Sequence, residues 1–384
     1  MKSLKLILSN PKYFGPSWVF ASINILFGTW AIYIPIVKEK LEINNSELGI
    51  AIFCLALGTF TVFPIASKLI TRFGVGKATR TGVLLVSMAA IFPLIAPSYV
   101  TLMVSLFFFG ASSAFTDISM NTLVTEIEKE EQENFMSAAH GFFSLGGVLA
   151  GLGSFLIPLL NNPAIHMGIA IVLVVLVNVF FFKNYSHVTA KIENKEPFGF
   201  KNFKPLLLLG VVSFFAMGSE GAVIDWSGLF LKEVSLAPEQ LIGTGFLAFS
   251  ITMTLGRFLG DLVSTKIGSE RLVTYGAILA ILGFGLVLTA QTYIAIAGFG
   301  LIGLGFSAMV PELFRIGGNV NGVESSQGIS FIAGTGYSGF LLAPVVLGFL
   351  AESYSLRITF ITLLVCSVLI LGASFLLKKS KISS

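Results

Sequence analysis

The sequence predicts an all-α membrane protein in which twelve transmembrane helices form two six-helix bundles. First, 55% of its 384 residues are hydrophobic and only 11% are charged, whereas a soluble domain carries about 25% charged residues. Second, twelve apolar runs are long enough to cross a bilayer. Third, short motifs recur at an offset close to half the chain length. The composition excludes a disordered chain, a disulfide-rich secreted scaffold and a nucleic-acid-binding protein.

Each predicted helix is an apolar run bounded by charged or turn-rich residues. A helix needs about 20 mostly apolar residues to cross the hydrocarbon core, whereas the strands of a membrane barrel alternate over about 10 residues. In chain order, the first bundle has predicted spans at 14–37, 46–70, 78–96, 99–125, 135–160 and 164–183. The second has them at 205–231, 238–265, 270–289, 293–316, 326–351 and 356–377. Only Pro97-Ser98 separates the third span from the fourth, and only Gln291-Thr292 separates the ninth from the tenth.

The longest polar stretch, residues 184–204, predicts a cytoplasmic linker between bundles at 1–183 and 205–384. With the N-terminus inside, 20 of the 24 Lys and Arg residues fall on the inner side and 4 on the outer side. Because cations concentrate in cytoplasmic loops, both termini are expected in the cytoplasm. No cleavable signal is expected, and the predicted location is the bacterial inner membrane, as a multi-pass protein.

Internal repetition relates the two halves. Residues 67–77 and 261–271 are similar at an offset of 194, and other matches follow at offsets of 195 and 196. The aligned pairs are Gly74 with Gly268, Asp117 with Glu312, Asn24 with Glu220, and Trp30 with Trp226. Two parallel six-span repeats are typical of transporters.

The basic turn after the second span resembles the signature loop of the major facilitator superfamily, which reads Gly-x-Leu-Ala-Asp-Arg-x-Gly-Arg-Lys. The first copy keeps Arg72, Gly74 and Lys77 but has Thr71 in place of the acid. The second copy has Asp261, Gly268 and Arg271, with Thr265 in place of the acid. The resemblance implies the superfamily fold and gating contacts at these loops. The missing acid weakens the family's Asp-based gate, and Arg257 with Asp261, one turn apart, is the expected substitute pair.

Longer strings resemble the bacterial YbjJ-type branch of the superfamily, for which no substrate is implied. These strings are residues 117–121, 136–147, 220–227 and 336–344.

Four acidic residues lie well inside predicted spans: Asp117, Glu220, Asp225 and Glu312. A carboxylate at the helix centre costs about 2.5–3.5 kcal/mol on insertion scales, so we expect these residues to couple transport to protons. Each has a structural alternative. The small-residue face around Asp117 also suits helix packing, and Glu312 has Arg315 on the same face as an ion-pair partner.

Glu220 is flanked by Gly218 and Gly221, which predicts either a bent helix lining a cavity or close helix packing. Asp225 lies about 140° around an ideal helix from Glu220. The two carboxyl groups therefore share a cavity only if the helix is distorted near Gly221.

Polar and aromatic side chains in the same strings are the candidate substrate-binding residues. They are Asn24, Trp30, Asn121, His140, Trp226 and Tyr337. The alternatives are an interhelical hydrogen bond for Asn24, interfacial anchoring for the tryptophans and a helix-end contact for His140. His166 and His187 are assigned to loops. The candidate gating residues are Arg72, Gly74, Lys77, Arg257, Asp261, Gly268, Arg271 and Arg315.

The sequence thus predicts a secondary active transporter that uses alternating access at a central cavity. Its expected activity is proton-coupled symport of a small polar, sugar-like solute. The alternatives are a proton-coupled drug or metabolite efflux antiporter and a non-transporting receptor or lipid-handling protein. A proton gradient is the expected energy source, with no cofactor and no metal. The expected partners are the solute and the lipid bilayer, with no nucleic acid, and the chain is expected to be a monomer. Enzyme motifs such as HExxH, a Walker loop or GxSxG are absent.

Overall fold

The computed structural model describes residues 2–189, 206–320, 323 and 325–379. Every regular element in these ranges is a helix. Twelve helical segments of the described chain are long and apolar enough to cross a membrane. The prediction of twelve transmembrane helices is therefore confirmed.

The described helices divide between two compact units. One unit consists of Met1–Ile43 and Ile50–Asn194, and the other of Asn44–Gly49 and Lys195–Ser384. The first half of the chain contains α1 (Lys2–Ser9), α2 (Pro11–Lys40), α3 (Asn45–Phe73), α4 (Val75–Ala90), α5 (Phe92–Ile95), α6 (Tyr99–Glu131), α7 (Met136–Gly153), η1 (Ser154–Leu156), α8 (Ile157–Leu160), α9 (Pro163–Phe181) and η2 (Phe182–Asn184). The second half contains α10 (Leu207–Glu233), η5 (Glu239–Leu241), α11 (Thr244–Ile267), α12 (Ser269–Leu288), α13 (Thr292–Phe306), α14 (Met309–Gly317), α15 (Ser325–Ser353) and α16 (Leu356–Lys379).

The two weakest predicted breaks are real helix ends. Ser98 has extended backbone and forms a capping box with Thr101, which starts α6 directly after Pro97. At the other break, Ala290 has a positive φ of 59° and Gln291 is extended, so α12 cannot continue into α13. Capping and backbone geometry therefore end these helices at positions where the hydropathy of the sequence changes little.

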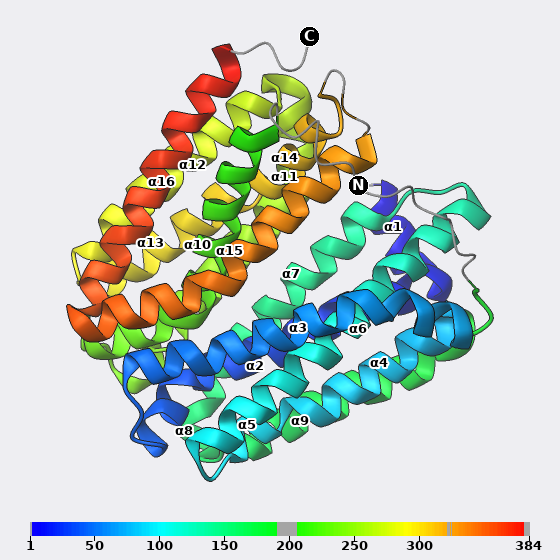
Figure 1. The fold of residues 1–384 in the computed structure, drawn as a ribbon. Coiled ribbons are helices and arrows are strands. Elements are labelled where there is room, and N and C mark those ends of the chain that lie inside the picture. The colour runs from blue at the N-terminus through cyan, green and yellow to red at the C-terminus, as the bar shows by residue number, and fades with distance from the viewer. Residues whose placement is uncertain (1, 190–205, 321–322, 324, 380–384) are drawn as a thin grey trace. The chain divides into compact units, whose positions relative to one another are not determined.

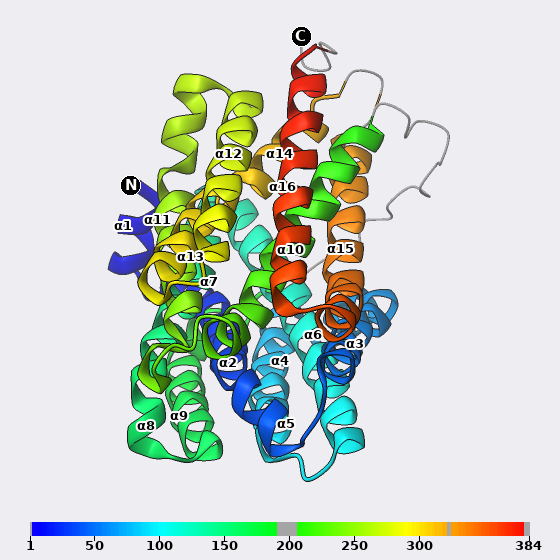
Figure 2. The ribbon, with the colours of Figure 1, turned by 90° about the vertical axis from the view of Figure 1, so that its left-hand side faces the viewer.

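Small residues set the close helix contacts within each unit. A Cβ atom on Gly146 of α7 would collide with the carbonyl oxygen of Ala21 on α2. In the second unit, Gly276 of α12 and Gly305 of α13 approach each other in the same way. Helices in lipid associate through such van der Waals contacts, because lipid tails supply no hydrophobic driving force. Figures 1 and 2 both show α10 and α15 side by side, another pair that packs through glycine.

The two signature turns have the same backbone conformation, although they lie 194 residues apart. Gly74, between α3 and α4, has φ 80° and ψ 141°, and Gly268, between α11 and α12, has φ 86° and ψ 152°. Only glycine adopts such angles readily, because it has no Cβ atom. The sequence repeat is thus also a repeat in backbone geometry at these positions.

Residues after η2 pack back onto the first unit. The amide of Gly76 donates a hydrogen bond of 3.1 Å to the carbonyl oxygen of Val188, and the Arg80 guanidinium lies 4.5 Å from the Phe182 ring centroid. Tyr185 is fully buried, and this burial raises the pKa of its hydroxyl above the ordinary value. The start of the predicted linker, through residue 189, therefore packs with the first unit, while residues 190–204 lie outside the described residues.

Candidate functional site

Glu220 is held by an arginine on the neighbouring helix. Arg257 of α11 donates a hydrogen bond from Nη2 to Oε1 of Glu220 on α10 at 3.1 Å. The side chains of Arg257 and Glu220 are only 19% and 12% exposed. The sequence had suggested Asp261 as the partner of Arg257. The guanidinium binds Glu220, and the expected pairing with Asp261 stays a prediction, because the Asp261 side chain lies outside the described part of the molecule.

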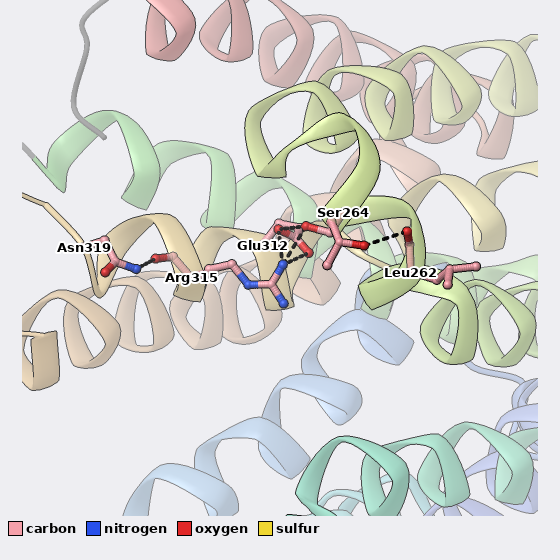
Figure 3. A network of polar contacts seen from close by, with 6 residues as sticks. Leu262, Ser264, Glu312, Arg315 and Asn319 are labelled. Carbon is pink, nitrogen blue, oxygen red and sulfur yellow. Dashed lines mark hydrogen bonds and ion pairs between the residues drawn. The ribbon is translucent and has the colours of Figure 1, made fainter. Parts of the chain in front are cut away.

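Glu312 lies in a second charged network, shown in Figure 3. Nη1 of Arg315 lies 3.1 Å and 3.2 Å from the two carboxylate oxygens of Glu312. Ser264 of α11 donates to the same carboxylate at 2.8 Å and accepts from Arg315 at 2.6 Å. The side-chain amide of Asn319 binds the Arg315 carbonyl oxygen at 2.7 Å. The expected ion pair is present, and the serine links it to a second helix.

Asp117 lies on α6 without a nearby cation in the described structure. Its contacts come from Asn121, one turn along the helix, whose Nδ2 donates to the Asp117 carbonyl oxygen at 2.9 Å and to Oδ1 at 3.3 Å. One turn in the other direction, Ser113 Oγ is buried and has no hydrogen-bond partner among the described atoms. Asp117 is the repeat counterpart of Glu312, but the residue that corresponds to Arg315 is Met120. The first unit therefore has the acid without its neutralising arginine.

Asp225 is partly buried on α10 and makes no hydrogen bond or ion pair with the described residues. The helix that carries it is continuous over 207–233. A Cβ atom on Gly221 would collide with the Phe340 ring, and one on Gly218 would lie 3.2 Å from the Gly339 carbonyl oxygen. The glycines around Glu220 therefore serve close packing of α10 against α15. The helix has no break at Gly221.

Three of the six predicted substrate-binding residues are engaged in helix packing. Asn24 of α2 donates to the Phe143 carbonyl oxygen of α7 at 2.9 Å, which is the interhelical bond considered as an alternative. Trp30 and Trp226 are fully buried, and the indole N–H of each has no acceptor among the described atoms. Both donors are thus available for a new hydrogen bond if the surrounding helices separate.

The remaining predicted residues are more accessible. His140 of α7 is exposed and meets the Phe20 ring edge-on, with centroids 5.0 Å apart. Tyr337 is half-buried on α15. At the signature turns, the predicted gating cations Arg72, Lys77 and Arg271 are exposed.

A buried histidine was missed by the sequence reasoning. His166, assigned to a loop, lies inside α9, where its Nδ1 is 3.1 Å from the Tyr33 hydroxyl of α2. The signal was present just before it, because Asn162 caps the helix and Pro163 occupies its first turn. The pairing with Tyr33 has no such local signal. Across the described residues, no group of three or more His, Cys, Asp or Glu side chains is placed to hold a metal.

The chain has recognisable relatives along most of its length. It is 28% identical to membrane protein MosC of Rhizobium meliloti, over 91% of this chain and 86% of that protein. It is 29% identical to an uncharacterized MFS-type transporter of Yersinia pestis, over 86% of each chain. A glucose/galactose transporter of Brucella abortus is 22% identical, over 93% of each chain.

The fold and a family profile agree with these relatives. The crystal structure of the nucleoside transporter NupG superposes with a TM-score of 0.74 at 14% identity, covering 96% of this chain and 99% of NupG. The profile of the Major Facilitator Superfamily matches residues 18–316. The protein is a multi-pass membrane transporter and not an enzyme. Its sequence and its fold both place it in the Major Facilitator Superfamily.

Proposed function

We propose that this transporter moves a small polar organic solute together with protons, by alternating access across the bacterial inner membrane. The observation that carries the proposal is that the four intramembrane acids differ in whether an arginine binds them. Glu220 and Glu312 are each bound by an arginine. Asp117 and Asp225 have no cation partner among the described residues.

Proton binding follows from the cost of an uncompensated charge. An ionised carboxylate inside a membrane must be paired, hydrated or neutralised. The arginines provide pairing for two of the acids. For Asp117 and Asp225, protonation is the remaining route to neutrality, and hydration during opening of the transporter favours release of the proton. A carboxyl group that alternates between these two environments couples solute movement to proton movement.

The chemistry of the solute is inferred from donors and relatives. Asn121 beside Asp117, together with the unpartnered indole N–H groups, suits a solute that carries acceptor oxygens and an apolar ring face. A relative named as a glucose/galactose transporter and a structural neighbour named as a nucleoside transporter support the same class. We therefore propose a hydroxylated, sugar-like solute.

The test uses purified protein reconstituted into liposomes. A thermal-shift panel of hexoses, nucleosides, amino acids and cationic dyes first identifies a ligand that stabilises the protein. We expect that ligand to accumulate when a pH gradient is imposed. Asp117→Asn should abolish gradient-driven accumulation and retain the ligand-dependent shift. Glu126→Gln, at an acid nearer the end of the same helix, is the matched control and should transport normally.

Two outcomes contradict the proposal. The first is a stabilising ligand whose flux does not respond to a pH gradient. The second is an Asp117→Asn variant that accumulates the ligand as well as the wild type does. A stabilising cationic dye that leaves the liposome in exchange for protons would instead support the efflux alternative.

A further inference from the structure

The surface of the first unit carries an apolar groove of about 870 Å³ that the transport proposal does not use. It is lined by one face each of α3, α4 and α6, with α5 at one end, and both views show α4 beside α6 (Figures 1 and 2). Met88 and Phe108 line the groove and are 65% and 61% exposed. Because these helices are membrane spans, the groove opens on a surface that contacts lipid.

One end of the groove lies at the signature turn and is strongly basic. The groove ends at Phe73 and Ala78, and Arg72 and Lys77 are their immediate neighbours in the chain. Both cations are exposed, and neither has an ion pair or hydrogen bond to a described residue. Their charges are therefore available to a ligand at this end of the groove.

No acid offsets this charge nearby in the sequence. Residues 48–116, which supply every lining residue of the groove, contain no Asp or Glu. The repeat-related turn of the second unit differs, because residues 261–271 include Asp261 and Glu270 beside their own cations. The lack of acids in the surrounding sequence is thus a property of the first turn and not of the repeat.

We propose that this groove binds one anionic phospholipid. The headgroup phosphate lies against Arg72 and Lys77, and an acyl chain lies along α4 and α6. Basic residues at the membrane surface attract anionic headgroups, and a guanidinium matches the geometry of phosphate oxygens. The apolar walls provide packing for the chain. The net negative charge of the headgroup distinguishes this lipid from zwitterionic lipids, whose phosphate is offset by a cationic amine.

The test measures lipid binding to the full chain in detergent by native mass spectrometry. Phosphatidylglycerol should bind more tightly than phosphatidylcholine with the same acyl chains. The double variant Arg72→Gln/Lys77→Gln should weaken phosphatidylglycerol binding about 30-fold, since each cation contributes about a factor of five. Lys266→Gln/Arg271→Gln removes the same charge at the repeat-related turn and should leave the affinity unchanged.

A second variant tests the groove separately from its charge. Thr81 lines the groove and is exposed, so Thr81→Phe should narrow it without disturbing the core and should reduce phosphatidylglycerol binding. Thr265→Phe, at an exposed threonine of the second unit, is its control. The proposal is overturned if the two lipids bind equally, if the control double variant loses as much affinity, or if soluble glycerol phosphate binds as tightly as the lipid.

Discussion

The ion pair between Glu220 and Arg257 makes a quantitative prediction about the second unit. The atoms Nη2 and Oε1 lie 3.1 Å apart, and at an effective dielectric constant of about 20 their attraction is about 5 kcal/mol. Much of this energy offsets the desolvation of the two charges. Removing one partner leaves the other charge buried, because water reaches little of either side chain. We therefore expect Arg257→Met and Glu220→Met each to lower the unfolding free energy by about 3 kcal/mol.

The double variant separates this effect from ordinary loss of packing. Glu220→Met/Arg257→Met removes both charges and keeps similar side-chain volume, so it should cost about 1 kcal/mol or less. The double-mutant cycle then gives a coupling energy of about 5 kcal/mol. This is well above the deviation from additivity that independent sites show.

The assay is equilibrium unfolding of the four proteins in mixed micelles at one pH and one ionic strength. Arg271→Met, which removes an exposed cation, is the matched control and should change the unfolding free energy by less than about 0.5 kcal/mol. A loss for Arg257→Met no larger than that for Arg271→Met would mean that the buried ion pair does not stabilise the second unit. The same conclusion would follow if the double variant lost as much unfolding free energy as the two single variants together.

Three further predictions concern helix packing, backbone geometry and a buried hydrogen bond. Gly110→Ala places a methyl group against a backbone carbonyl of α3 and should destabilise the protein by about 1–3 kcal/mol. Gly168→Ala, with nothing within 4 Å of its Cβ, should be neutral or stabilising in the same thermal-unfolding assay. Gly268→Ala meets no neighbour but has a positive φ, so its expected cost of about 1–2 kcal/mol is purely conformational, and equal stability with wild type would contradict it. Tyr33→Phe removes the hydrogen bond to His166 and should cost about 0.5–1.5 kcal/mol, measured against the wild type; an unchanged melting temperature would mean that the bond contributes nothing.

Local features of the candidate site were predictable from the sequence. Glu312 and Arg315 are three residues apart, which places them on one helical face, and the structure joins them. Asp117 and Asn121 are four residues apart and also meet. Such pairs are visible in the sequence because helical geometry alone brings them together.

Contacts between helices were not predictable in the same way. Arg257 pairs with Glu220, 37 residues away on another helix. Tyr33 and His166 are separated by 133 residues. A single sequence does not show which faces of two helices pack together. These partners therefore depend on the tertiary packing.

The sequence by itself determined the membrane class, the number of spans, the two related halves and the glycine at each signature turn. These follow from hydropathy over the bilayer thickness and from backbone angles that only glycine adopts. The tertiary structure decided that Glu220 is neutralised, because its arginine comes from another helix. An ion pair needs two charged groups within about 4 Å. The packing of α10 on α11 brings Arg257 to Glu220, whereas the described residues provide no such partner for Asp117 or Asp225.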